Sequence, residues 1–242
     1  MAFSETARRV SFSASQFCGV EAPSRPDLLN RGNLEMRRPP FIADQARNAR
    51  GLLGRLIAFI MARETWRENL RVMDKLGIEQ GDHVLDIGCG HGRSLMELAA
   101  RAPRGRIVGV DPSELMIEIA KQRNRPLIEA ARVDVILSSV ESLPFPDDMF
   151  DKAQCVHVLY FWKDIGTSLR EIARVLKPSG CLGLLFRTNA DMKAIASFPP
   201  EIYRFPPLAD ISAALERAGM DVHVVGDGAN EPALVLATKR RA

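Results

Sequence analysis

Hydrophobic and polar positions along most of the chain follow two periods, and the order of these periods predicts an α/β fold. Short apolar runs, typical of strands buried in a sheet, occur near 82–87, 106–111, 133–138, 150–157 and 181–186. Stretches with helical periodicity lie between several of these runs, near 93–102, 113–123 and 166–176. Because strands and helices alternate, we expect a parallel, doubly wound sheet with helices on both faces.

The pattern changes after residue 207. A helix is predicted over 208–218, followed by two strands over 221–225 and 233–238. The segment between the two strands is rich in Gly, Asp and Asn, which are typical turn residues. We therefore expect these strands to pair as a hairpin at the edge of the sheet.

Apolar residues at helical spacing also precede the first strand. They predict one or two helices over 51–78, with Gly77 as the C-terminal cap. The first part of this region is apolar on almost every side, so we expect it to cover a substrate pocket; burial in the core and contact with a membrane surface are the alternatives. No apolar stretch approaches the ~20 residues that span a bilayer, and stable membrane insertion is not expected.

Residues 1–40 are rich in Ser, Arg and Pro and lack a sustained period, which is typical of a disordered tail. A transit peptide is an alternative that Glu5 and Glu21 disfavour, and Met36 is an alternative start. We expect a tail at 1–40 and a single domain at 41–242, with an N-terminal helical cap at 41–65.

Length, charge and cysteine spacing limit the kinds of protein that this chain can be. A chain of 242 residues with 46% hydrophobic content can bury one substantial core. The net charge of +3 comes from residues 1–50, which hold eight Arg against five acidic residues. The remainder is neutral, so a nucleic-acid partner is not expected. The four cysteines contain no C-x-x-C pair, which disfavours a zinc site or a disulfide framework and favours reduced thiols in the cytoplasm.

The candidate chemistry centres on Val84-Leu85-Asp86-Ile87-Gly88-Cys89-Gly90-His91-Gly92, an apolar strand that ends in an acid and three glycines. Gly88, Gly90 and Gly92 allow the backbone to turn sharply and to approach a ligand closely. Their G-x-G-x-G spacing differs from the G-x-G-x-x-G of dinucleotide-binding proteins. Asp86 would repel a phosphate but attract an ammonium or sulfonium group. These features favour S-adenosylmethionine (SAM) over a nicotinamide cofactor.

This stretch resembles motif I of the class I SAM-dependent methyltransferases, usually V-L-D-I-G-C-G-x-G. Residues 144–151 (P-F-P-D-D-M-F-D) and 169–180 (L-R-E-I-A-R-V-L-K-P-S-G) also resemble motifs of this family, in particular of the type 11 branch that contains the ubiquinone and menaquinone C-methyltransferases. The resemblance covers roughly 70–187. It implies a Rossmann-like, doubly wound sheet of seven strands, mostly parallel with a reversed terminal strand, and SAM as the cofactor with S-adenosylhomocysteine as its product.

Two further strand ends provide candidate cofactor contacts. Asp111 ends the second predicted strand and is expected to accept hydrogen bonds from the ribose hydroxyls. The alternative is an N-terminal helix cap, a role that Ser113 can fill. Ser139 stands where the resembling methyltransferases carry an Asp that contacts the adenine amino group. The full predicted cofactor set is Asp86, Gly88, Cys89, Gly90, Gly92, Asp111, Pro112, Met116, Ser139, Val140 and His157, and no metal site is predicted.

His157 is the candidate catalytic residue, because a neutral imidazole near the methyl group could accept a proton from the acceptor. Packing against the cofactor and holding a loop are the alternatives. The expected function is methyl transfer to a small or lipid-like acceptor that enters beneath 41–65 and 188–207. Ser139 and Ser179, at motif positions that usually hold Asp and Gly, leave a non-catalytic SAM-binding module as the main alternative. A nicotinamide-dependent oxidoreductase is a less favoured third possibility.

Overall fold

The structure is a computed structural model that describes residues 39, 42, 51, 64–229 and 231–241. All of these residues lie in one unit, Glu35–Ala242. The expected tail at 1–40 and the helical cap at 41–65, apart from single positions, lie outside the described residues. Within the described part, no helix is long and apolar enough to cross a membrane.

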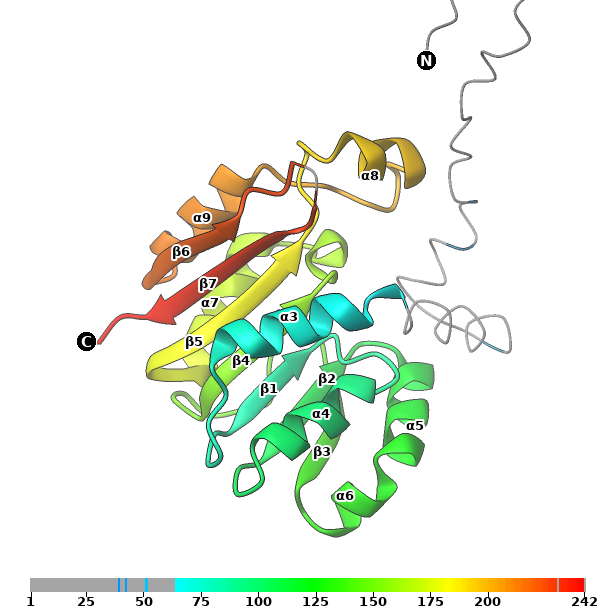
Figure 1. The fold of residues 1–242 in the computed structure, drawn as a ribbon, viewed down its shortest axis with the longest axis vertical. Helices are drawn as coiled ribbons and strands as arrows, with labels where there is room; N and C mark the ends of the chain where they lie inside the picture. Colours follow the sequence, from blue (N-terminus) through cyan, green and yellow to red (C-terminus); the bar gives the residue numbers. More distant parts are fainter. Residues whose placement is uncertain (1–38, 40–41, 43–50, 52–63, 230, 242) are drawn as a thin grey trace, which may run out of the picture. The chain divides into compact units, whose positions relative to one another are not determined.

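A seven-stranded sheet with the order β3-β2-β1-β4-β5-β7-β6 forms the centre of this unit (Figure 1). The first five strands along the chain pair in parallel, whereas β7 is antiparallel to both β5 and β6. The strands are β1 (Val84–Ile87), β2 (Ile107–Asp111), β3 (Val133–Leu137), β4 (Phe150–Val156), β5 (Leu176–Phe186), β6 (Met220–Gly226) and β7 (Ala233–Lys239). The predicted Rossmann-like sheet, its reversed terminal strand and the C-terminal hairpin are confirmed.

Successive residues of the central strands are buried on opposite faces. Val84 belongs to the apolar cluster with Leu95 of one helical layer, whereas the next residue, Leu85, belongs to the cluster with Ile172 and Leu215 of the other. A strand covered on both faces has no solvent-facing position. This is why the first two strands appear in the sequence as continuous apolar runs.

The helices cover both faces of the sheet (Figure 1). The long ones are α3 (Trp66–Leu76), α4 (Arg93–Arg101), α5 (Glu114–Arg123), α7 (Ile165–Val175) and α9 (Leu208–Arg217). Three short elements are not predicted by periodicity: α6 (Arg125–Glu129), the 3-10 turn η1 (Leu159–Phe161) and α8 (Met192–Ser197). Each has fewer than two helical turns, too few to display a period.

Helix α3 lies over β4, β5 and β7, and its Val72 and Leu76 pack against Leu185 of β5 and Leu234 of β7. Gly77 ends this helix in the left-handed conformation, with φ of 59°, as its position in the sequence predicts. Helix α3 therefore runs across the sheet close to the carboxyl end of β4, where its first residues can reach a ligand site.

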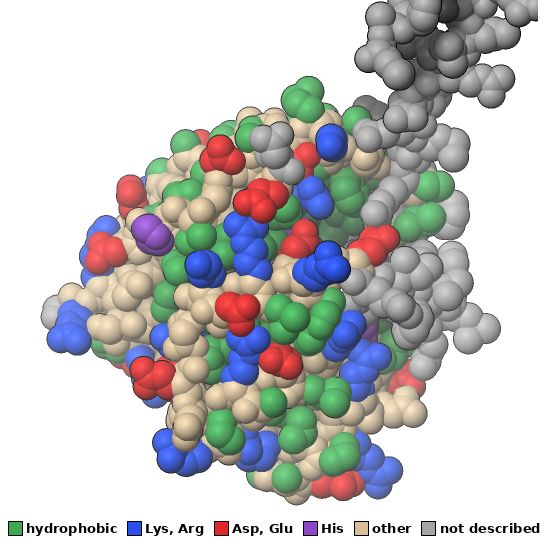
Figure 2. Space-filling model, viewed as in Figure 1, with side chains coloured by type: hydrophobic (Ala, Val, Ile, Leu, Met, Phe, Trp, Pro, Cys, Tyr) green, Lys and Arg blue, Asp and Glu red, His purple; other side chains and the backbone are tan. Residues whose placement is uncertain are grey.

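Basic and acidic side chains are interspersed on the face of the molecule shown in Figure 2. Several of them form ion pairs across the surface, such as Arg71 with Glu231 and Arg101 with Asp74. Exposed pairs of this kind contribute little to stability.

Candidate functional site

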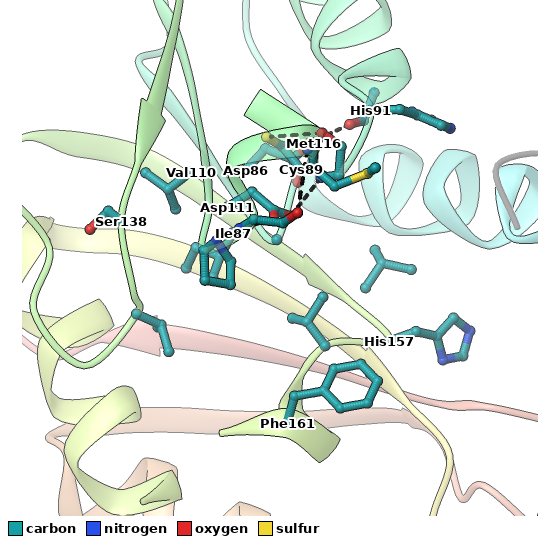
Figure 3. A pocket seen from close by; sticks show the side chains of 18 of the residues that line it. Asp86, Ile87, Cys89, His91, Val110, Asp111, Met116, Ser138, His157 and Phe161 are labelled. Atoms are coloured by element: carbon teal, nitrogen blue, oxygen red, sulfur yellow. Dashed lines mark hydrogen bonds between the residues drawn. The ribbon is translucent and has the colours of Figure 1, made fainter. Parts of the chain in front are cut away.

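A cavity of about 390 Å³ opens at the carboxyl ends of β1, β2, β3 and β4, next to the first turn of α3 (Figure 3). Most of the residues predicted to bind the cofactor line it: Asp86, Gly88, Cys89, Gly90, Asp111, Pro112, Met116, Ser139, Val140 and His157. Gly92 is the exception. It packs against α5, where a Cβ would lie 2.6 Å from Asn124 Nδ2 and 2.7 Å from the Ala120 Cβ, so its lack of a side chain serves helix packing.

The glycine loop adopts left-handed backbone conformations, with φ of 71° at Gly88 and 51° at Gly90. A Cβ at Gly88 would lie 2.3 Å from Cγ1 of Val158, so only glycine allows the loop to approach the end of β4 this closely. The Gly88 and Cys89 N–H groups both donate to the Val110 carbonyl, over 2.8 and 3.0 Å. These bonds tie the loop to β2.

Asp86 is a buried carboxylate at the base of the cavity. It accepts hydrogen bonds from the Ser94 hydroxyl and, over 3.0 Å, from the Gln154 side-chain amide. Burial raises the pKa of Asp86 to about 6, against the opposing effect of these two bonds, and the negative charge of Asp111 adds to the rise. None of the described groups that shift this pKa is a cation, so a positively charged ligand would be favoured here.

Asp111 lies at the end of β2 with both oxygens held by backbone groups. The Gly90 N–H donates to Oδ2 over 3.0 Å, and the Ser113 N–H donates to Oδ1 over 2.9 Å. Burial raises the pKa of Asp111, and these two bonds oppose the rise. Ser113, and not Asp111, is the N-terminal cap of α5. Each carboxylate oxygen can accept more than one hydrogen bond, so Asp111 retains capacity for ligand hydroxyls.

His157 lines the cavity, but both of its ring nitrogens are engaged elsewhere. Nε2 lies 2.9 Å from Oε2 of Glu68 on α3, and Nδ1 lies 3.0 Å from the Tyr160 hydroxyl, which accepts from the Arg187 N–H. Figure 3 shows the imidazole directed away from Asp111. The ring therefore links α3 to the segment after β4. Its action as a base stays a prediction and requires that one of these bonds breaks first.

The pKa of the Glu68 carboxyl depends on its contact with His157. Burial raises its pKa, but the hydrogen bond and charge of His157, together with Arg187 and Arg71, outweigh burial and lower the pKa overall. Glu68 is therefore ionised at neutral pH.

Helix α3 and its N-terminal cap contribute Thr65, Trp66 and Asn69 to the cavity, which sequence reasoning missed. The Arg93 guanidinium lies 3.9 Å from the centre of the Trp66 ring, in a cation–π arrangement at the lip of the cavity. The sequence shows Trp66 only as an apolar helical position, because nothing local indicates that it meets the glycine loop.

His91 also lines the cavity. Burial lowers its pKa to about 4, and the nearby Arg123 and Arg93 lower it further. Its Nδ1 accepts the Arg93 N–H over 3.2 Å. His91 is therefore neutral at physiological pH and serves the start of α4.

The turn after β3 brings a further carboxylate into the cavity. Glu141 accepts a hydrogen bond from the Ser139 hydroxyl and, over 3.1 Å, one from the Lys163 N–H. Glu141 is not among the residues predicted from the sequence to bind the cofactor. Among the described residues, no group of His, Cys, Asp and Glu could hold a metal ion.

The segment 188–207, expected beside the acceptor, does not line this cavity. Its aromatic residues Phe198, Tyr203 and Phe205 pack with one another and with Tyr160. These aromatic residues form a layer behind the segment that follows β4, and they do not form a wall of the cavity.

Comparison with known proteins identifies the family. Residues 85–184 match a family model described as a methyltransferase domain. The O-methyltransferase rstn1 of Aspergillus nomiae is 31% identical over 165 residues, which cover 65% of this chain and 72% of that protein. The chain belongs to the SAM-dependent methyltransferases. The family expected from the motifs is thereby confirmed, and SAM is the family's cofactor.

Two further proteins are similar to this methyltransferase. The 2-phytyl-1,4-naphtoquinone methyltransferase of Synechococcus elongatus is 39% identical over 106 residues, which cover 43% of this chain and 46% of that protein. A crystal structure of a SAM-dependent methyltransferase from Aquifex aeolicus is 25% identical, with a TM-score of 0.59, and the match covers 71% of this chain and 89% of that chain.

The motifs at 144–151 and 169–180 of this methyltransferase meet in space. Arg174 donates to the carbonyls of Leu143 and Phe145, over 3.1 and 2.8 Å, and pairs with Asp147 and Glu171. The two motifs therefore form one structural unit, in which Arg174 of α7 holds the loop before β4. Asp151, the last residue of the first motif, accepts the His83 N–H over 2.9 Å near the start of β4.

Proposed function

We propose that the cavity binds SAM and that the methyltransferase transfers its methyl group to a small, lipid-like acceptor. The observation that supports this most strongly is the pair of buried carboxylates, Asp86 and Asp111, beside a loop whose glycines admit a ligand. A cationic, phosphate-free nucleoside complements this pair, because a sulfonium and an ammonium compensate buried negative charge that a phosphate would increase.

In this proposal each carboxylate has its own role. Asp111 accepts both ribose hydroxyls while it continues to hold the loop through Gly90. Asp86, one strand further along, favours the positive charge of the methionine portion. Pro112, Met116 and Val140 form apolar walls for the base, in agreement with the burial of Met116 and Val140.

When bound, SAM would supply an activated methyl group, because its sulfonium sulfur would keep the electron pair of the bond that breaks. The protein aligns the reactants and excludes water, and positioning of this kind can supply up to ~7–11 kcal/mol of the barrier reduction. Val158 and Phe161 present apolar side chains to the cavity at the end of β4. They shield the reacting atoms from solvent.

Trp66, Phe161 and Trp162 support an apolar, ring-bearing acceptor, because flat apolar surfaces pack well against aromatic side chains. The names of the two curated relatives specify an O-methyltransferase and a naphthoquinone methyltransferase. We propose the cytoplasm as the location, where Cys89, Cys155 and Cys181 would stay free thiols, as they are in the structure.

Calorimetry with SAM, S-adenosylhomocysteine and NAD, followed by transfer of labelled methyl from SAM to a panel of phenols, quinols and amines, tests this proposal. We expect both sulfur nucleosides to bind and at least one apolar acceptor to be methylated. Binding without transfer to any acceptor class would support the non-catalytic module, and binding of NAD alone would support an oxidoreductase.

A further inference from the structure

Gln154 of β4 is a polar residue that the packing of the fold does not explain. Its side chain is fully buried, and its Oε1 has no hydrogen-bond partner among the described residues. An apolar side chain of similar length would fill the same space without an unsatisfied oxygen, which is costly in a protein interior. The reason for a glutamine here must lie in the hydrogen bond that its amide nitrogen makes.

That hydrogen bond goes to Asp86. The two residues are register partners on the adjacent strands β1 and β4, so their side chains lie on the same face of the sheet. Gln154 Nε2 donates to Asp86 Oδ1 over 3.0 Å. Beside Gln154 on β5 is Gly183, where a Cβ would lie 2.7 Å from Cγ1 of Val72 on α3. Helix α3 thus packs closely onto the sheet next to this pair, and Gln154 itself does not line the cavity.

The groups that interact electrostatically with Asp86 disfavour its ionised form. Burial raises the pKa of Asp86, and the negative charge of Asp111 on β2 adds to the rise. Burial, and then the negative charge of Asp86, raise the pKa of the Cys89 and Cys155 thiols, which therefore stay neutral. None of these neighbours can compensate the charge of Asp86.

The other charged or titratable groups at this end of the sheet do not compensate it either. The Arg93 guanidinium of α4 lies over the Trp66 ring, and Glu68 of α3 pairs with His157. Burial lowers the pKa of His91 in the glycine loop to about 4, so this ring is neutral. The ionised form of Asp86 therefore depends on its hydrogen bonds.

Among the described residues, two side chains donate to Asp86: the Ser94 hydroxyl and the Gln154 amide. We propose that Gln154 is a positioning residue, which keeps the Asp86 carboxylate ionised and oriented so that it can compensate the positive charge of the cofactor. The inference rests on the proposed placement of the cofactor. It accounts for the unsatisfied Oε1, because an amide that donates to a carboxylate turns its oxygen the other way. The competing account is that Gln154 only fills space between β4 and α3.

The first test follows the charge of Asp86 directly, by carbon-13 NMR of its carboxyl group against pH in the ligand-free full chain. In the unmodified protein the midpoint should lie at about 6, where burial places the pKa of Asp86. Gln154→Met cannot donate and should raise this midpoint by about one pH unit or more, since hydrogen bonds to charged groups are among the stronger ones. Gln122→Met, at an exposed position of α5, is the matched control and should leave it unchanged.

The second test measures the affinity for SAM by calorimetry over the same pH range. The pH below which the Kd rises should move up in Gln154→Met together with the Asp86 midpoint. A double-mutant cycle separates this effect from altered packing. In an Asp86→Asn background, the further change Gln154→Met should not alter the pH dependence of the Kd. Thermal unfolding checks that each variant folds, and Gln154→Leu takes the place of Gln154→Met if the latter does not.

An unchanged Asp86 midpoint in the folded variant would overturn the proposal. It would also be overturned if the midpoint rises while the pH dependence of SAM binding stays the same, because Gln154 would then have no effect on the cofactor. If SAM does not bind even the unmodified protein, the proposed function fails and the link to the cofactor fails with it. The NMR midpoints would still show whether Gln154 sets the charge of Asp86.

Discussion

The Asp111 carboxylate accepts a hydrogen bond from the Gly90 N–H over 3.0 Å, across the gap between β2 and the loop after β1. The residue proposed to bind the ribose therefore also holds the glycine loop. Gly90 adopts its φ of 51° without steric cost because it is a glycine, and the bond to Asp111 holds the loop in this one conformation. Cofactor binding and loop geometry are coupled through this one carboxylate.

The affinity for SAM should fall as the pH falls through about 6, where burial places the pKa of Asp86. A cationic ligand favours the ionised acid, so below that pH binding must release a proton, and Kd should rise toward tenfold per pH unit. The ligand's own carboxyl and amino groups titrate near ~3.5 and ~8, outside this window. Calorimetry between pH 5 and 7 measures the effect.

Asp86→Asn should give a Kd for SAM that changes less with pH over the same range, and a pH-independent Kd in the unmodified protein would contradict the assignment.

In the free protein the same raised pKa makes ionised Asp86 unfavourable. Its contribution to stability is therefore present at low pH and is lost as the pH rises from about 4 to about 6. Bound SAM should oppose this loss.

Replacement of His157 by Asn tests whether this residue mainly holds the structure together. Asn tolerates the left-handed backbone, with φ of 58° at this position, but removes the ring that bridges Glu68 and Tyr160. We expect a loss of about 1–3 kcal/mol in the free energy of unfolding, because two partly buried groups lose their partner. Denaturant unfolding measures it.

SAM affinity should stay within about threefold in the same variant. His223→Asn, at an exposed position of β6, serves as the control and should be nearly neutral. Unchanged stability in His157→Asn would show that the bridge contributes nothing, and the catalytic role would then become the better account.

Ser179→Gly should stabilise the protein by about 0.5–1 kcal/mol. Ser179 has φ of 66°, a left-handed conformation that glycine adopts without steric cost. The family's usual glycine at this position therefore reflects the turn and not the chemistry. Ser142→Gly, where the backbone is not left-handed, should be neutral or destabilising, and a loss of stability in Ser179→Gly would contradict the argument.

The fold could be predicted from the sequence because the strands are covered on both faces and the glycine loop has a distinctive spacing. Val84 and Leu85, for example, are consecutive apolar residues that are buried on opposite faces of the sheet. The Asp111 position followed from the rule that ligands lie at the carboxyl ends of parallel strands. These are local patterns that a single sequence displays.

The remaining parts of the site depend on contacts between distant residues. Glu68 meets His157 across 89 positions of the chain, and no local pattern indicates that pairing. Trp66 likewise lines the cavity only because α3 crosses the sheet beside the glycine loop.

The measurement that tests the central claim most directly is SAM binding by calorimetry to the unmodified protein and to Asp111→Ala, with Asp210→Ala as an exposed control. We predict that Asp111→Ala binds SAM at least tenfold more weakly and still unfolds cooperatively, whereas Asp210→Ala binds as the unmodified protein does. Unchanged affinity in a folded Asp111→Ala variant would contradict the placement of the cofactor in this cavity.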